Sequence, residues 1–157
     1  MTESQFRIWS SQSIERYALE KMRVMRCTRA EAERIAQRAF EARMPHGLSS
    51  ADNFLRAIIY GADTVVGFLW YCIRNAGDRR SAFIVDLIVD DDWRRKGIGY
   101  HTMLLLEEAV RELEVESIGL HVFGANTPAR ALYASLGYEV VDAFMEKGLS
   151  RGAPRAR

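Results

Sequence analysis

The sequence lacks the features that would direct a protein into or across a membrane. It contains no apolar run of membrane-spanning length, and its first residues, MTESQFRIWS, do not show the basic-then-apolar layout of a signal peptide. It has only two cysteines, Cys27 and Cys72, which are too few for a disulfide framework and are typical of a reducing compartment. We therefore expect a cytoplasmic protein that does not bind membranes.

Net charge is also nearly absent. The chain has 22 Lys and Arg against 21 Asp and Glu, which gives a formal charge of +1. This balance provides no overall field to attract nucleic acid, so we expect no such partner, and any attraction for an anion must come from a local patch. His46 and His101 lack metal-ligand spacing with each other or with either cysteine. The run Asp90–Asp92 is interpreted as a solvated turn, so no metal site is predicted.

What remains is the composition of one globular domain. The 157 residues are 48% hydrophobic and 27% charged, and no internal repeat or domain linker is visible. The N-terminal part predicts a short strand at Phe6–Trp9 and a helix from Ser13. Thr28 then caps a second helix, with Glu31 completing a capping box, and Met44–Pro45 ends it because proline disfavours helix in the residue before it.

The middle of the chain predicts a sheet. Loop 45–52 is equally consistent with substrate contacts and with a plain surface connection. Segments 53–60, 65–74 and 81–90 are strand-like and separated by glycine-containing turns, which predicts an antiparallel meander. A long helix from Ile98 and a strand at 117–123 follow, and this strand–helix–strand order favours parallel pairing.

The C-terminal part predicts a helix from Thr127 to about Leu136, with Thr127 as its cap, Pro128 at the first helical position and Gly137 after its end. Segments 138–141 and 144–149 are predicted to form a closing hairpin, and the polar tail 150–157 is predicted to be disordered. The expected fold is therefore a single α/β domain over residues 1–149, with a mixed sheet of about six to seven strands flanked by about four helices.

The rest of the chain is organised around Ala82–Leu106, where a strand runs into a glycine-broken basic turn and then into a helix. Such a turn presents several backbone N–H groups toward one point, and the helix start adds the positive end of its dipole. Arg94, Arg95 and Lys96 raise the local positive potential further. The stretch therefore predicts a site for a phosphate or pyrophosphate group.

Two familiar phosphate-binding patterns do not fit this turn. The dinucleotide fingerprint Gly-x-Gly-x-x-Gly would need a third glycine where Thr102 stands. The P-loop needs the order Gly-x-x-x-x-Gly-Lys-Ser/Thr, which Gly97 and Gly99 do not supply. The pattern that remains is Arg94-x-x-Gly97-x-Gly99, which is weak by itself but stronger in this order of elements.

Two further segments fit the same context. Leu87-Ile88-Val89-Asp90 resembles a strand end that binds a pantetheine arm. Asn126, followed by the segment 129–138, is similar to an Asn…Ala-x-x-Leu-Tyr-x-x-x-Gly-Phe motif in which Tyr138 replaces the commoner Phe. With these motifs in register, nearly the whole chain resembles the GNAT superfamily of acetyl-coenzyme-A-dependent N-acetyltransferases.

The resemblance implies how acetyl-CoA is bound. In similar enzymes two central parallel strands splay apart, and backbone groups of the first pair with the pantetheine amides as if these were an added strand. The pyrophosphate lies on the glycine turn, where the absence of Cβ atoms allows close approach. The cofactor-binding residues implied are Leu87, Ile88, Val89, Arg94, Arg95, Lys96, Gly97, Ile98, Gly99, Tyr100, Asn126 and Arg130.

Three side chains are candidates for proton transfer. The resemblance gives Tyr133 the role of proton donor to the leaving thiolate, although helical spacing also fits a core aromatic residue. His121 matches the position of a glutamate base in ribosomal-protein N-terminal acetyltransferases, and histidine titrates near neutrality. A satisfied structural histidine is an equally good interpretation. Asp86 could accept a proton through water, or it could be a hydrogen-bonded orienting group.

The leading hypothesis is thus an acyltransferase that moves an acetyl group from acetyl-CoA directly to a primary amine of a protein, peptide or small molecule. The alternative is a non-catalytic acyl-CoA-binding sensor or interaction domain on the same fold. The sequence does not identify the amine acceptor. A homodimer is compatible with the resemblance, but no residue pattern specifies it.

Overall fold

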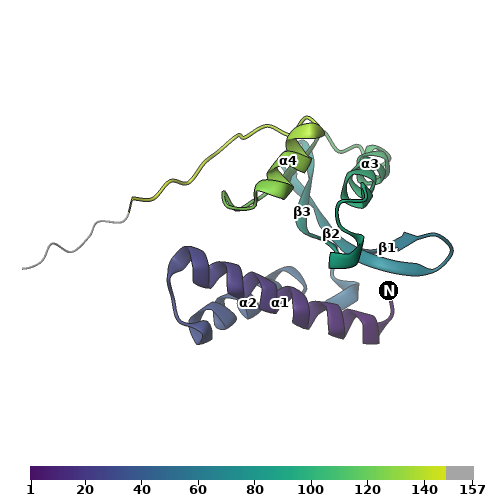
Figure 1. The fold of residues 1–157 in the computed structure, drawn as a ribbon. Helices are drawn as coiled ribbons and strands as arrows, with labels where there is room; N and C mark the ends of the chain where they lie inside the picture. Colours follow the sequence, from purple (N-terminus) through teal and green to yellow (C-terminus); the bar gives the residue numbers. More distant parts are fainter. Residues whose placement is uncertain (148–157) are drawn as a thin grey trace, which may run out of the picture. The chain divides into compact units, whose positions relative to one another are not determined.

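The computed structural model describes residues 1–147. Its helices are α1 (Glu3–Met25), α2 (Arg29–Arg43), α3 (Ile98–Arg111) and α4 (Thr127–Ser135), and its strands are β1 (Asn53–Tyr60), β2 (Thr64–Ala76), β3 (Arg79–Val89) and β4 (Ser117–Leu120) (Figure 1). Two short 3-10 helices, η1 (Gly47–Ser49) and η2 (Asp91–Trp93), lie in the loops. The chain forms two compact units, residues 1–123 and the residues from 124 onward, so the sheet and α1–α3 belong to the first and α4 to the second.

Helix α1 starts with a capping box. The Thr2 hydroxyl accepts a hydrogen bond from Gln5 N at 3.3 Å, and the Gln5 side chain accepts one from Thr2 N at 2.8 Å. Phe6, Trp9 and Ser13 then form one buried stripe at helical spacing. The predicted strand at Phe6–Trp9 is therefore wrong, and the helix begins at Glu3 rather than at Ser13.

Helix α2 has the predicted start and end. The Thr28 hydroxyl accepts from Glu31 N at 3.3 Å, and the Glu31 carboxylate accepts from Thr28 N at 2.9 Å and from the Thr28 hydroxyl at 2.7 Å. The hydrogen bond from the Thr28 side chain, followed by that from its backbone N–H, lowers the pKa of Glu31 below its ordinary value of 4.5. The helix ends at Arg43, directly before Met44–Pro45, as predicted.

An aromatic cluster joins α1 and α2 to one face of the sheet. Trp9 lies edge-on to Trp70 of β2 at 5.5 Å between ring centroids, and Phe40 lies edge-on to Trp70 at 5.6 Å. Trp70 is 3% exposed, and its indole N–H donates to Asn53 Oδ1 at 2.9 Å, so its one polar atom is satisfied. Farther along, the small residues Ala18, Ala32 and Ala36 are buried where the two helices pack on each other.

The sheet has four strands in the order β1-β2-β3-β4. The antiparallel meander of β1, β2 and β3 is confirmed, with slightly longer strands than expected. Strand β4 pairs with β3 in parallel from Ser81↔Ser117 to Ile84↔Leu120, which confirms the predicted crossover through α3. It is shorter than predicted, because it stops at Leu120 instead of Phe123.

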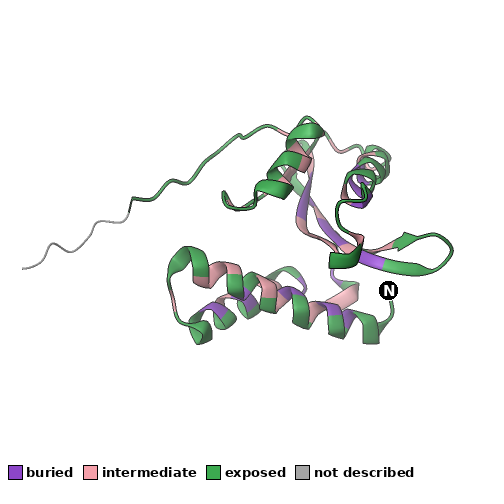
Figure 2. Ribbon diagram, viewed as in Figure 1, coloured by how far each residue is buried: buried purple, intermediate pink, exposed green. Residues whose placement is uncertain are grey.

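The expected six to seven strands are therefore a wrong prediction for the described residues. One expected strand, Phe6–Trp9, is helical. The other missing strands are those of the predicted closing hairpin. Residues 138–147 contain no strand, and residues 139–147 are exposed (Figure 2). Their apolar side chains have the pattern of a strand, but pairing needs a partner as well as a pattern. Leu149 and the tail 150–157 lie outside the described residues.

Helix α4 begins one residue earlier than its sequence suggests. Asn126, not Thr127, is the N-cap, and its side-chain oxygen accepts from Ala129 N at 3.3 Å. Thr127 and Pro128 are the first two helical residues, where the missing N–H of proline costs no hydrogen bond. The helix ends at Ser135, and Gly137 follows with φ 83°, the left-handed conformation that glycine adopts easily.

Candidate functional site

The central feature of the site is the end of β3, where the strand continues beyond its pairing with β4. The β3–β4 ladder ends at Ile84↔Leu120, whereas β3 continues to Val89. On its other side β3 stays paired with β2 as far as Val89↔Gly67. The last part of β3 therefore has one occupied edge and one edge that β4 does not cover.

A bulge at Val85 decides which backbone groups face the uncovered edge. Trp70 is opposite Asp86 and Tyr71 is opposite Ile84, so Val85 has no partner of its own. Before the bulge, Arg80 O faces β4 and accepts from Glu116 N at 2.9 Å. After it, Asp90 N faces β2 and donates to Val66 O at 2.9 Å. Backbone groups alternate sides along a strand, so Leu87 and Val89 direct theirs away from β2.

Gly67 is a site residue that the sequence interpretation missed. A Cβ atom at this position would lie 2.1 Å from Ile88 O and 3.0 Å from Val89 Cα, both of them backbone atoms of β3. Only glycine allows β2 to approach the end of β3 this closely. A glycine inside a strand rich in aromatic and β-branched residues was the available signal, because it marks a bulge or a close backbone approach.

The glycine turn forms a nest of backbone N–H groups at the start of α3. Arg95 has φ 63° and Gly97 has φ 78°, both left-handed, and Gly97 is the N-cap of α3. His101 N is the first helical donor with an intrahelical acceptor, Gly97 O at 3.0 Å. The N–H groups of Ile98, Gly99 and Tyr100 precede it in the first turn and have no such acceptor. This geometry suits an anion.

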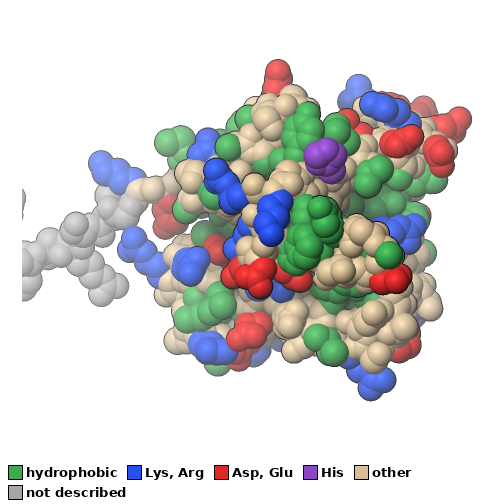
Figure 3. Space-filling model, turned by 45° about the vertical axis from the view of Figure 1, so that its right-hand side comes forward, with side chains coloured by type: hydrophobic (Ala, Val, Ile, Leu, Met, Phe, Trp, Pro, Cys, Tyr) green, Lys and Arg blue, Asp and Glu red, His purple; other side chains and the backbone are tan. Residues whose placement is uncertain are grey.

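Two of the three basic side chains of the turn, Arg94 and Lys96, are engaged in local contacts. Arg94 donates through Nε to Val89 O at 3.0 Å and forms an ion pair with Asp91 at 2.7 Å. Lys96 Nζ lies 4.8 Å from the ring centroid of Trp93, which in turn contacts Tyr60. The face drawn in Figure 3 shows basic and acidic side chains interspersed, in keeping with the net charge of +1. Roles for Arg94, Arg95 and Lys96 toward a phosphate stay predictions.

Asp86 ties β3 to α1. Its Oδ2 accepts from the Ser13 hydroxyl at 3.0 Å and from Arg16 Nη2 at 3.1 Å. Ser13 is buried and the Asp86 side chain is 25% exposed, so this is a partly desolvated ion pair. These contacts are those expected of a hydrogen-bonded, orienting carboxylate. Proton transfer through Asp86, the other role considered, stays a prediction.

His121 follows directly after β4 and is exposed. Its ring meets the ring of Phe83 edge-on, with 5.3 Å between centroids. Phe83 is opposite Gly119 in the parallel ladder, and His121 lies two residues beyond Gly119, so both side chains point to the same face of the sheet. Asp86 and Trp70 are opposite each other in register, and both contact α1, so this is also the face that α1 covers.

The remaining predicted residues belong to the second unit. Asn126 caps α4, and Arg130 Nη1 donates to Gly124 O at 3.2 Å. Tyr133 is partly buried and its ring centroid is 5.7 Å from that of Tyr138. These contacts describe the local structure of α4 and its flanks. Roles for Asn126, Arg130 and Tyr133 toward a cofactor or thiolate stay predictions.

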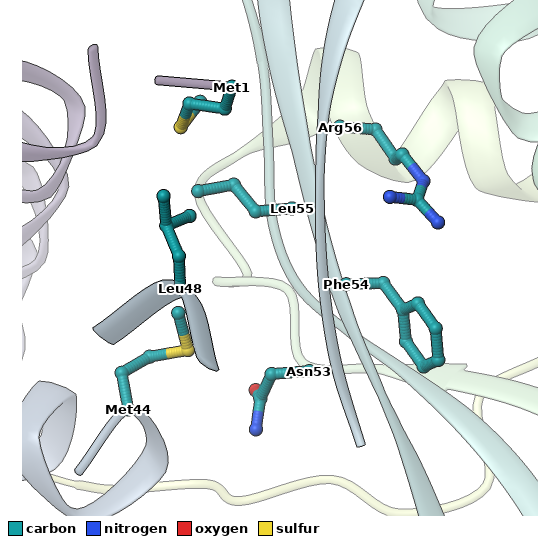
Figure 4. A pocket seen from close by; sticks show the side chains of 7 residues that line it. All are labelled: Met1, Met44, Leu48, Asn53, Phe54, Leu55 and Arg56. Carbon is teal, nitrogen blue, oxygen red and sulfur yellow. The ribbon is translucent and has the colours of Figure 1, made fainter. Parts of the chain in front are cut away.

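Two cavities lie away from the uncovered edge of β3. One of about 220 Å³ is beside β1 and includes Met1, Met44, Leu48 and Leu55 in its lining. Figure 4 shows Leu55 pointing toward Leu48 and Met1, while Phe54 and Arg56 lie on the other side of the strand. A second cavity of about 400 Å³ lies where α2, the loop 45–52 and β2 meet. Neither is lined by a residue predicted for cofactor binding or proton transfer, although loop 45–52, for which substrate contacts were considered, lines part of both.

Residues 1–147 contain neither a metal-binding cluster nor a membrane-spanning helix. No three His, Cys, Asp or Glu side chains in this range gather closely enough to hold a metal ion. In the same range, none of the helices has both the length and the apolarity to cross a membrane.

Comparisons with known proteins agree with this geometry. The model of the Acetyltransferase (GNAT) family matches residues 22–138. Two Bacillus subtilis (strain 168) proteins named as uncharacterized N-acetyltransferases, YycN and YdgE, are 28% and 29% identical over 149 residues, which is 95% of this chain and 96% and 95% of theirs. The crystal structure of YycN, a putative acetyltransferase from Bacillus subtilis, superposes with a TM-score of 0.89 over 95% of both chains.

Proposed function

Because the chain belongs to the Acetyltransferase (GNAT) family, we propose that it is an N-acetyltransferase that uses acetyl-CoA and transfers the acetyl group directly to a primary amine. The observation that carries this proposal is the uncovered edge of β3 next to the glycine turn. Leu87 offers a backbone donor and acceptor there, Val89 offers a backbone donor while its carbonyl already accepts from Arg94, and the turn offers N–H groups within the same segment of chain. An elongated ligand with amides at one end and phosphates at the other fits this combination.

The residues present fit acetyl-CoA in three respects. The backbone of Leu87 and Val89 can pair with the amides of the pantetheine arm. The backbone groups of Ile88, which lies between them, face β2 instead. The first-turn N–H groups of Ile98, Gly99 and Tyr100 suit a pyrophosphate. Gly97, with φ 78°, holds the turn in the conformation that aims these groups outward. Arg94, which bonds to Val89 O, joins the two parts of the site.

Acetyl-CoA supplies the acetyl group as a thioester with a thiolate as leaving group. An amine attacks only when it is unprotonated, and an ordinary lysine amine has a pKa of about 10.4, so a base next to the amine accelerates the step. For the reaction to balance, the N–C bond would form as the C–S bond breaks, His121 would take the amine proton, directly or through water, and the leaving thiolate would take up a proton, which is the donor role that the family resemblance predicts for Tyr133. Asp86, held by Ser13 and Arg16, fastens β3 to α1 and so supports the strand.

Two measurements test the proposal. Isothermal titration calorimetry of the full chain with acetyl-CoA should give a one-site isotherm, and thiol release should be detected when a panel of primary amines is added. If the protein binds acetyl-CoA but none of the amines in the panel causes thiol release, it is a non-catalytic sensor instead. Absence of binding at millimolar acetyl-CoA would overturn both.

A further inference from the structure

A three-residue cluster lies on the sheet face that carries His121, and no role in the proposed reaction has been given to two of its members. The guanidinium carbon of Arg74 in β2 is 3.4 Å from the ring centroid of Phe83 in β3. The same phenyl ring meets His121 edge-on at 5.3 Å. Phe83 is 9% exposed, so these two side chains help to cover it. The Arg74 guanidinium and the His121 imidazole therefore lie within reach of one small molecule.

Arg74 is positioned but not neutralised. Residue 74 is exposed, and in the described range 1–147 no carboxylate lies within ion-pair distance of it. Asp86, the carboxylate farther along the same face of β3, is engaged by Ser13 and Arg16. A guanidinium stacked on a ring uses its flat face, which leaves its N–H edge to bind a planar carboxylate in a two-pronged fashion.

A second arginine of the sheet, Arg56, lies near an aromatic ring without a histidine beside it, and so serves as a comparison for Arg74. Arg56 in β1 lies 5.6 Å from the ring centroid of Phe54, which is too far for close face-on contact. Phe54 itself is stacked on Tyr71 at 4.9 Å, and no imidazole contacts either ring. Arg56 also lies on the edge strand, beside the small cavity in Figure 4. Among the arginines of residues 1–147, only Arg74 shares its aromatic ring with a candidate base.

We propose that the acceptor is a small amine that also carries a carboxylate close to the amine, as an amino acid does, and that Arg74 binds this carboxylate. The inference rests on the proposed function. The carboxylate pairs with the N–H edge of Arg74, which holds the amine of the same molecule near His121. The acetyl group then passes from sulfur to this nitrogen, the amine proton goes to His121, and the thiolate takes up a proton, the step for which Tyr133 is the predicted donor. Arg74 is thus a specificity-determining residue.

The test compares amino acids with their amides, which keep the amine and lose the carboxylate charge. Kinetics are measured for wild type, Arg74→Gln, Arg74→Met and the matched control Arg56→Gln. Arg74→Met keeps an unbranched side chain over Phe83, in case the glutamine variant does not fold. Each variant is compared with wild type on the same substrate, so differences in amine pKa between acid and amide cancel.

Loss of a charge-assisted bidentate contact should raise KM for the amino acid about 10- to 100-fold, with kcat changed much less. KM for the amide should stay within about twofold, and Arg56→Gln should change neither substrate. Equal effects on acid and amide would mean that Arg74 only supports Phe83, and would overturn the inference. So would an enzyme whose amino-acid turnover does not depend on Arg74, or one that acetylates no carboxylate-bearing amine. Failure of wild type to bind acetyl-CoA in calorimetry would instead overturn the proposed function itself.

Discussion

The two edges of β3 differ in how far each is paired with its neighbouring strand. On the edge toward β2 the pairing runs to Val89, and at Gly67 the two backbones are so close that a Cβ atom would lie 2.1 Å from Ile88 O. On the edge toward β4 the pairing stops at Ile84, and even the glycine of that ladder, Gly119, has room, with 3.8 Å from a Cβ to Phe83. The closed edge fixes the end of the strand whose open edge carries the backbone groups of the proposed acetyl-CoA site.

The largest effect should come from placing a methyl group on the closed edge. Gly67→Ala should displace Ile88 and Val89, lower the free energy of unfolding by about 1–3 kcal/mol and weaken acetyl-CoA binding at least tenfold. Gly119→Ala, the same change on the other edge, should leave acetyl-CoA affinity within about twofold.

Calorimetry and hydrogen exchange separate local from global damage in Gly67→Ala. The amide of Asp90, which bonds to Val66 O, should lose protection, whereas the amide of Ile73, which bonds to Asp52 O, should keep it. Uniform loss of protection at both amides would contradict a local displacement of the strand end.

The glycine turn gives the next largest effect. Gly97→Ala places a Cβ atom on a residue with φ 78°, which costs about 1 kcal/mol of strain and tilts the first N–H groups of α3. Acetyl-CoA affinity should fall about tenfold, measured by calorimetry. Gly77→Ala is the matched control, since Gly77 has φ 63° in the turn between β2 and β3 with open space around it. It should lose similar stability and no affinity; equal losses of affinity would contradict the assignment of the turn.

A substitution of Asp86 tests whether this residue takes part in proton transfer or only stabilises the contact between β3 and α1. Asp86→Asn removes a partly exposed ion pair with Arg16, so thermal unfolding should indicate a loss of about 1 kcal/mol, weaker at high salt. Glu33→Gln, in an exposed pair with Arg29, should cost less. A hundredfold fall in kcat for Asp86→Asn at unchanged stability would instead make Asp86 a proton-transfer group.

The smallest effect is expected at the capping box of α2, far along the chain from both edges. The folded-state pKa of Glu31 is lowered by the hydrogen bonds from Thr28, so its stabilising contribution is present at neutral pH and is lost as pH falls below 4.5 toward the folded value. Glu31→Gln should therefore slightly flatten the acid limb of a stability-versus-pH curve from urea unfolding and leave acetyl-CoA affinity unchanged. An altered affinity would show that α2 is coupled to the strand edges.

The sequence was most informative where local chemistry decides the structure. The cap of α2 and the turn before α3 depend on residues within a few positions of each other, and both were predicted correctly. The parallel pairing of β3 with β4 joins distant segments, and it was predicted from the order strand–helix–strand. Phe6–Trp9 was misinterpreted because a four-residue apolar segment fits either period, and the capping box Thr2–Gln5 was the cue that decided for helix. The hairpin at 138–149 was predicted from side-chain pattern alone, which does not supply a partner strand.

The open edge itself could be predicted only in part. The strand end Leu87–Val89 and the glycine turn were recognisable as motifs, whereas the bulge at Val85 depends on the registers of β2 and β4 at once. Gly67 was visible in the sequence, but its need to be glycine appears only when Ile88 O is placed opposite it. The contact between Arg74 and Phe83 could not be predicted from the sequence either, because it depends on the register between two strands that a turn connects.

The bulge at Val85 has a consequence for how this segment tolerates change. The edge of β3 that we propose binds acetyl-CoA is made of backbone, so many side chains at Leu87 and Val89 would preserve the backbone groups that face away from β2. A single inserted or deleted residue between Val85 and Val89 would reverse the alternation and turn those groups toward β2. Length is therefore constrained here more tightly than identity, and variation among functional variants should consist of substitutions without insertions or deletions.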